Sequence, residues 1–517
     1  MEKNYDFRKR MLIVHKPGIR EESAVKSFNG IIVDASWEIV YVKSDDPVLV
    51  NAAYDFKEFL EVSHGVSVNA RECSDISDVL NNPDKRIIAV DFPVSPESAP
   101  GFTEPLAYRL IAGRGIIVCA NSARGAAQGL YYTEDLMNFN LGPMLSPCDI
   151  SRKPLFSPRM VHSGYALDVY PDEHLRAIAH AGMDAILVFV KGVNQTAHGH
   201  VDFNDLIRRA AAYGIDVYAY SYLKCWKHPG DADAREVFSE TFGKIFKEAG
   251  FRGIVLVGES VEFPSKDPRT TGKPHRCNAV DNPEGKPSPG WYPCCDYPDW
   301  VCLVRDVVRE HKPDADIVFW TYNWGYVEEE ARIELIKRLP EDISLLVTYE
   351  MFEEFKINDK ITEQCTDYTL SFEGPGKYFL SEAREAKKRG IRLYTMCNTG
   401  GLTWDIGVIP YEPAPFQWKR RHDGLRRAHY EYGLVGLMES HHYGFWPSFV
   451  SELAKNAFWE PSLSFNDAAR SIAGRDFGAE NADKVLDALE YYSEGIRHYI
   501  PTNEDQYGPF RIGPAYP

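Results

Sequence analysis

Two carboxylates follow directly on an apolar run in the middle of the chain. Residues 254–257 are all aliphatic, Gly258 ends the run, and Glu259 and Glu262 come next with two residues between them. A short apolar run that stops at a glycine predicts a buried strand. Neighbouring carboxyl groups shift each other's pKa, so one can hold a proton while the other is ionised. This pairing is typical of glycoside hydrolysis, in which one acid protonates the departing oxygen. We therefore predict Glu259 and Glu262 as the catalytic residues.

Polar and aromatic side chains also follow the other predicted strands. Aromatic residues make up 13% of the chain, and their flat faces stack on the apolar faces of sugar rings. Carboxylates, amides and cations bind the sugar hydroxyls. Taken singly, each such residue is also explained as a helix cap or a solvated charge. Taken together, we expect substrate contacts from Asp168, Lys191, Trp291, Asp296, Tyr322, Trp324, Glu350, Trp404, Asp405, Glu439, His441 and His442.

The elements that must position these residues form a regular pattern. Short apolar runs alternate with amphipathic helical segments from residue 160 to about 445, which predicts a parallel sheet. Eight such units predict a (β/α)₈ barrel, whose active site lies at the carboxyl ends of the strands. An open doubly wound sheet is the rival, but no glycine-rich phosphate loop supports it. The predicted strands are 160–168, 185–190, 216–222, 253–259, 316–322, 343–350, 391–397 and 434–440.

Two further regions flank the predicted barrel. Residues 1–150 alternate strand-like and helix-like segments, which predicts a small α/β domain, and a proline-rich hinge at 143–159 follows it. Residues 151–445 form the catalytic barrel. Residues 446–517 are predicted to be a helical extension that packs on the barrel or on a partner chain, so a homodimer stays open. The predicted fold is thus α/β, a TIM barrel between a small α/β domain and a helical C-terminal region.

Composition excludes several classes of partner. The net charge of −17 argues against nucleic acid and against an anionic membrane surface, because both need clustered lysine and arginine. The sequence has no apolar run of 18 residues, so we predict no transmembrane helix. The charged N-terminus does not resemble a secretory signal. The ten cysteines are scattered through a long chain, as is typical of reduced thiols. We predict a cytoplasmic protein with a carbohydrate substrate and no cofactor.

A long loop after the fourth predicted strand holds several potential zinc ligands. Their spacing matches no standard zinc motif, so we predict no metal. The alternative is a loop that folds over the substrate pocket, as long loops at an active site often do. The potential ligands are His275, Cys277, Cys294 and Cys295, with Cys225 and His228 as helpers.

Three stretches of the chain resemble the family 20 β-N-acetylhexosaminidases. "IVYVKSDDPVLVNAAYDFKEFL" (39–60) and "GIIVCANSARGAAQGLYYTEDLM" (115–137) are similar to the small α/β domain that precedes the barrel in that family. "FSPRMVHSGYALDVY" (156–170) is similar to the family's first barrel strand. The resemblance implies an exo-acting glycosidase that removes a terminal β-linked GalNAc or GlcNAc.

The chain departs from that family at two positions. The family ends its fourth strand with an Asp-Glu pair that supports catalysis by the substrate's acetamido group, whereas this chain has "VGES" with Glu259 alone there. The family's first-strand arginine is also missing near Ser163. α-Glucuronidases share a similar first domain and barrel and are the nearest alternative, with Lys191, Lys224 or His442 as the cation for their acidic sugar. Another barrel hydrolase or lyase, and a carbohydrate-binding protein without catalysis, also stay open.

Overall fold

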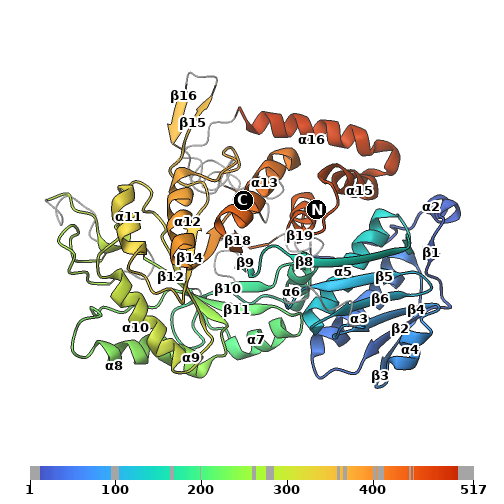
Figure 1. The fold of residues 1–517 in the computed structure, drawn as a ribbon, viewed down its shortest axis with the longest axis horizontal. Coiled ribbons are helices and arrows are strands. Elements are labelled where there is room, and N and C mark those ends of the chain that lie inside the picture. The colour runs from blue at the N-terminus through green and yellow to red at the C-terminus, as the bar shows by residue number, and fades with distance from the viewer. Residues whose placement is uncertain are drawn as a thin grey trace.

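The fold is built around a closed barrel of eight parallel strands (Figure 1). The computed structural model describes residues 12–94, 104–163, 168–197, 199–258, 263–274, 284–357, 361–364, 369–399, 403, 413–441, 444–445 and 447–498. In order around the barrel the strands are β10 (Ala185–Val190), β11 (Asp216–Ser221), β12 (Gly253–Val257), β13 (Asp316–Trp320), β14 (Ser344–Thr348), β17 (Arg392–Met396), β18 (Leu434–Ser440) and β9 (Arg159–His162). Each predicted strand overlaps one of these, so the (β/α)₈ prediction is confirmed.

Helices follow the strands and cover the outside of the barrel. Their apolar faces pack on the strand residues that point outward, and the last turns of two of them end at glycines with positive φ, Gly390 and Gly433. The covering helices are α6 (Asp172–His180), α7 (Phe203–Ala211), α8 (Ala234–Phe238), α9 (Lys244–Glu248), α10 (Tyr297–Arg309), α11 (Glu329–Ile336), α12 (Lys377–Arg389) and α13 (Pro415–Tyr432). A hairpin of β15 (Glu354–Ile357) and β16 (Ile361–Gln364) projects between β14 and α12.

A seven-stranded sheet lies beside the barrel. Its order is β19 (Trp459–Glu460), β8 (Cys148–Pro154), β5 (Tyr108–Ala112), β6 (Ile116–Ala120), β4 (Arg86–Val90), β2 (Glu38–Val42) and β3 (Asn69–Cys73). The segment interpreted as a hinge from its prolines instead forms β8, which pairs antiparallel with β5. β8 spans the expected boundary at residue 150, and β19 comes from the C-terminal region. One sheet therefore joins the three predicted regions.

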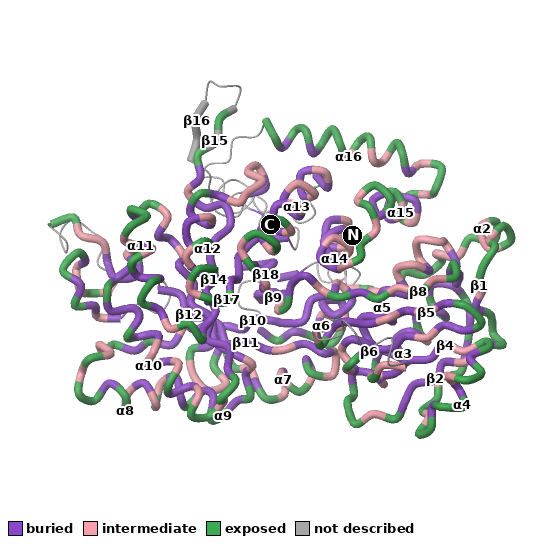
Figure 2. The backbone as a smooth tube through the Cα atoms, viewed as in Figure 1, coloured by how far each residue is buried: buried purple, intermediate pink, exposed green. Residues whose placement is uncertain are grey.

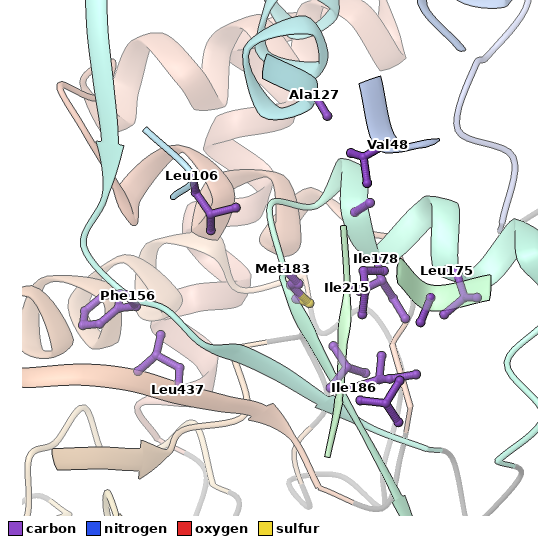
Figure 3. Packing of buried hydrophobic residues seen from close by; sticks show 14 of the residues in the cluster. Val48, Leu106, Ala127, Phe156, Leu175, Ile178, Met183, Ile186, Ile215 and Leu437 are labelled. Atoms are coloured by element: carbon purple, nitrogen blue, oxygen red, sulfur yellow. The ribbon is translucent and has the colours of Figure 1, made fainter. Parts of the chain in front are cut away.

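The small domain and the barrel also share one hydrophobic core. Figure 3 shows Val48 and Ala127, from helices α3 (Pro47–His64) and α5 (Ala123–Phe139), in the same cluster as Ile178 and Ile186 of the barrel. Burial of this kind is the dominant favourable term in folding. The barrel strands are almost wholly buried in Figure 2. We conclude that the two regions form one packed body.

Three helices complete the described chain. They are α14 (Phe449–Ala457), α15 (Phe465–Phe477) and α16 (Ala482–Ile496), in agreement with a helical C-terminal region. α16 lies on the surface and is mostly exposed (Figure 2). Among the described residues no helix has the length and apolar character needed to cross a membrane. The cysteines among the described residues form no disulfide, and Cys277 and Cys365 lie outside the described residues.

Candidate active site at the carboxyl ends of the barrel strands

The inside of the barrel is filled by buried side chains, most of them apolar, which we call the plug. Alternate residues of each strand point inward, as the two-residue period of a strand requires. Above this plug, the carboxyl ends of the strands form what we call the barrel mouth. The plug consists of Met160, Ala185, Leu187, Phe189, Tyr218, Tyr220, Val255, Val257, Val318, Trp320, Leu346, Tyr394, Met396 and Met438.

Aromatic side chains line one side of the mouth. The rings of His162 and His441 stack with centroids 5.1 Å apart and planes 3° from parallel. The Tyr220 hydroxyl lies 3.1 Å from His441 Nε2, and the Trp320 ring meets His441 edge-on at 4.8 Å. Tyr322 packs on Trp320 with centroids 4.5 Å apart. We call these five residues the aromatic floor; four of them are fully buried, and Tyr322 is partly exposed.

A β-bulge in β18 turns His441 toward the mouth. Met438 pairs with Met160, but the next paired residue is Ser440, which faces Val161, so Glu439 is the extra residue. The bulge reverses the alternation beyond it. His441 thereby joins the aromatic floor, as predicted for one of the two histidines.

Glu439 consequently lies outside the mouth, where we had expected it to bind substrate. It is fully buried, its Oε1 accepts a hydrogen bond from Arg159 Nε, and its Oε2 accepts one from Thr399 Oγ1 at 2.8 Å. Arg159 also donates to the carbonyl of Gly182 at 3.1 Å. The side chain is thus half of an internal ion pair. The expectation rested on the place of Glu439 at a strand end, whereas the inward-facing Met438 before it directs Glu439 to the outer side of β18.

Asp168 is a buried acid at the end of β9. Its Oδ1 accepts hydrogen bonds from the Ser163 hydroxyl and from the Phe189 backbone N–H at 3.2 Å, so it continues the ladder between β9 and β10. Within the part of the chain that the structure describes, its Oδ2 has no hydrogen-bond partner. Burial raises the pKa of Asp168 to about 6, against the lowering effect of the two hydrogen bonds. The carboxyl group can therefore gain or lose a proton near neutral pH.

Asn398 lies two residues after β17, at a strand end, and is not among the residues that we predicted to contact the substrate. It is fully buried, its φ is 51°, and neither its amide nitrogen nor its amide oxygen has a hydrogen-bond partner among the described residues. Positive φ and an unmet buried amide each cost on the order of 1–3 kcal/mol. Such costs gather at binding sites, where a ligand supplies the missing partners. In sequence, Asn398 is indistinguishable from an asparagine of an ordinary turn.

Two further predicted residues lie at strand ends. Glu350 is fully buried two residues after β14 and accepts a hydrogen bond from Arg421 Nη1 of α13 at 3.3 Å. Arg421 also donates to the Cys397 carbonyl at 3.1 Å. Glu350 therefore lies beside a buried cation. Lys191 directly follows β10 and is exposed.

Trp324 and Asp296 have structural surroundings instead of the expected sugar contacts. Trp324 is fully buried outside the barrel, where it packs on Tyr297 at 5.3 Å and donates to the Gly290 carbonyl at 3.1 Å. Asp296 is buried and accepts hydrogen bonds from Ser265 Oγ at 2.8 Å and the Lys266 N–H at 2.7 Å. Both residues anchor the long segment after β12, whose own polar groups need partners.

The remaining predicted residues divide into one exposed residue and a group that the structure does not describe. Trp291 is exposed in a short 3₁₀ helix, Pro289–Trp291, of the segment after β12. Glu259, Glu262, Trp404, Asp405 and His442 lie outside the described residues, as do His275 and Cys277 of the zinc alternative. In the described part of that loop, burial raises the pKa of the Cys294 thiol well above its usual range, which disfavours a thiolate ligand.

A buried charge network joins the small domain to α6, away from the mouth. His180 lies between two carboxylates, with Nε2 2.6 Å from Asp55 and Nδ1 3.3 Å from Glu134. His15, Asp55 and His180 are close enough together to hold a metal ion. Arg176, however, already donates to both Asp55 and His15 Nδ1. The guanidinium supplies the positive charge, so we interpret the cluster as an ion-pair network.

Comparisons with known proteins agree with the fold. No family model matches the chain, and no curated protein matches it by sequence. It is similar in structure to a GH138 enzyme targeting pectin rhamnogalacturonan II, with TM-score 0.57 and 10% identity over 89% of this chain and 70% of that one. It is also similar to the GH20 β-N-acetylhexosaminidase of Streptomyces coelicolor A3(2), with TM-score 0.53 and 12% identity over 92% and 96% of the two chains. A Streptomyces plicatus β-hexosaminidase solved with GlcNAc gives TM-score 0.53 and 12% identity over 92% and 94%. At these identities the likeness establishes the fold alone.

Proposed function

We propose that the protein is an exo-acting glycoside hydrolase that removes a terminal sugar, in the first place β-linked N-acetylhexosamine. One observation carries the proposal. Buried polar groups with unmet hydrogen bonds, Asp168 Oδ2 and the Asn398 amide, flank the aromatic floor at the carboxyl ends of three adjacent strands, β17, β18 and β9. A sugar ring offers the complement, a flat apolar face and a rim of hydroxyls. The fold likeness to hexosaminidases supports the choice of sugar.

The acids have different parts in the proposed reaction. Val255 and Val257 of β12 face the barrel interior, and the same alternation continued along the sequence favours Glu259 over Glu262 as the proton donor. The proton goes to the glycosidic oxygen as the bond to the anomeric carbon breaks. Asp168, whose pKa is raised to about 6, binds a hydroxyl of the sugar through a hydrogen bond. Once Asp168 is ionised, its negative charge stabilises the developing oxocarbenium ion. Stacking on the aromatic floor orients the ring.

A panel of p-nitrophenyl glycosides tests the proposal. It comprises the β-N-acetylglucosaminide, the β-N-acetylgalactosaminide, the β-galactoside and the α-glucuronide. We expect release from an N-acetylhexosaminide, reduced by at least about a hundredfold in Glu259→Gln and in Asp168→Asn. Asp172→Asn is the matched control, since Asp172 is exposed on α6 and pairs with Arg209 at 2.8 Å. No hydrolysis of any glycoside in the panel, together with no sugar binding by calorimetry, would overturn the proposal.

An α-glucuronidase is the second candidate, and Lys191 is the observation that favours it. This lysine is exposed directly after β10, the strand next to β9, where it can meet the carboxylate of an acidic sugar. Preference for the α-glucuronide, lost in Lys191→Met, would select this candidate. Retained preference for an N-acetylhexosaminide in that variant would reject it.

A further inference from the structure

Three large aromatic side chains are exposed on consecutive segments at the barrel mouth. Trp226 follows β11, Trp291 follows β12 and Tyr326 follows β13, with 58%, 36% and 50% of their surfaces exposed. These strands are neighbours in the barrel, so the segments after them are neighbours at its carboxyl end. We call Trp226, Trp291 and Tyr326 the aromatic rim. Exposed aromatic groups in one place on a soluble protein indicate a binding surface.

The rim is held in place by contacts between its segments. The Tyr326 hydroxyl donates to the Trp291 carbonyl, which joins the segments after β13 and β12. His228, two residues after Trp226, lies 3.2 Å from Asp296 and joins the segments after β11 and β12. A surface fixed in this way loses little conformational freedom when it binds a ligand.

The rim and the aromatic floor share the segment after β13. Tyr322 belongs to the floor, is partly exposed and precedes Tyr326 by only four residues. Other exposed aromatic side chains do not lie at the barrel mouth. Tyr491 and Tyr492 are 81% and 61% exposed, but they lie on α16, far along the chain from any strand end. Position at the mouth, more than exposure itself, distinguishes the rim.

Charged pairs lie on the same segments as two of the rim's rings. Lys227 pairs with Asp233 at 2.8 Å, and Lys266 pairs with Asp231 at 3.3 Å. A protein partner or a lipid surface would require a contiguous apolar patch. A chain of sugars instead alternates apolar ring faces with hydroxyl edges, which suits rings interspersed with polar groups.

We propose that the aromatic rim binds the second and third sugars of an oligosaccharide whose terminal sugar occupies the mouth. The inference rests on the proposed function and narrows it. The natural substrate is then a glycan chain, and a single sugar on a small leaving group uses only part of the site. Contacts remote from the reacting bond lower KM for long substrates and leave the chemistry of the short ones unchanged.

The test compares N,N′,N″-triacetylchitotriose with p-nitrophenyl β-N-acetylglucosaminide. In Trp291→Ala we expect kcat/KM for the trisaccharide to fall about tenfold, the effect of one lost stacking ring, with the aryl glycoside unchanged. Tyr326→Phe keeps its ring but loses the hydrogen bond to the Trp291 carbonyl, so we expect kcat/KM for the trisaccharide to fall less than in Trp291→Ala, with the aryl glycoside unchanged. Tyr491→Ala is the control for loss of an exposed ring elsewhere.

Two outcomes would overturn the inference and separate it from the proposed function. Equal effects of Trp291→Ala on both substrates, or no effect on either, would show that the rim does not select for chain length. If wild type hydrolyses neither substrate, calorimetry with triacetylchitotriose shows whether the rim still binds the trisaccharide. Weaker binding by Trp291→Ala than by wild type would uphold the rim although the proposed hydrolysis fails, and no binding by wild type would reject both.

Discussion

Asp168 should make the protein less stable at neutral pH than it would be with an asparagine in its place. The pKa of Asp168 is about 6 in the folded protein, above the ordinary value of 3.8, because burial disfavours the charged form. The folded state therefore binds this proton more tightly than the unfolded state does. The resulting stabilisation is complete below pH 3.8 and is lost as the pH rises to 6. A shift of about 2 pKa units corresponds to roughly 3 kcal/mol.

Asp168→Asn isolates this effect. The amide keeps the oxygen that accepts from Ser163 and Phe189, and it replaces only the oxygen that has no partner. We expect the free energy of unfolding of the variant, relative to wild type, to rise by up to about 3 kcal/mol between pH 4 and pH 7. Urea unfolding at each pH measures it, with Asp172→Asn as the control. A difference between variant and wild type that does not change with pH would refute the reasoning.

Two further predictions concern groups outside the mouth. Glu439→Gln leaves Arg159 buried without its counter-charge and should lower the free energy of unfolding by about 3–5 kcal/mol. If the variant instead loses activity while its stability in urea is unchanged, Glu439 acts on the substrate and the structural role is wrong. The pKa of His180 is about 9, because the carboxylates of Glu134 and Asp55 outweigh the lowering effect of burial. This stabilisation is complete below pH 6.5 and is lost as the pH rises through 9, so the advantage of wild type over His180→Gln should shrink by about 3 kcal/mol over that range. An advantage that is constant from pH 6 to pH 10 in thermal unfolding would contradict it.

The barrel could be predicted from sequence because its strands are short, apolar and regularly spaced. Most are buried on both faces, so several appear as continuous apolar runs such as 185–190, which is β10 to the residue. β8 was missed for the opposite reason. Its sequence, CDISRKP, is polar and ends in proline, and its strand character comes from pairing with β5 at the sheet's edge.

The site residues were harder to predict than the elements that hold them. A strand end identifies which residues can face the mouth, but the bulge at Glu439 changes which of them do. Trp324 looks like a sugar-stacking residue in "TYNWGY", yet the chain turns it outward into the core. Asn398 gives the opposite case, since only the unmet hydrogen bonds of the folded chain reveal it. Local sequence does not contain these distant contacts.

The measurement that tests the central claim most directly is the activity of Asn398→Gly on the glycoside that wild type cleaves best. Glycine accepts the positive φ at this position and removes only the amide, so the fold is kept. If the amide binds the sugar, kcat/KM falls by about a hundredfold, with Asp172→Asn unchanged. Activity of Asn398→Gly equal to that of wild type would contradict the claim that the barrel mouth is the site of sugar cleavage.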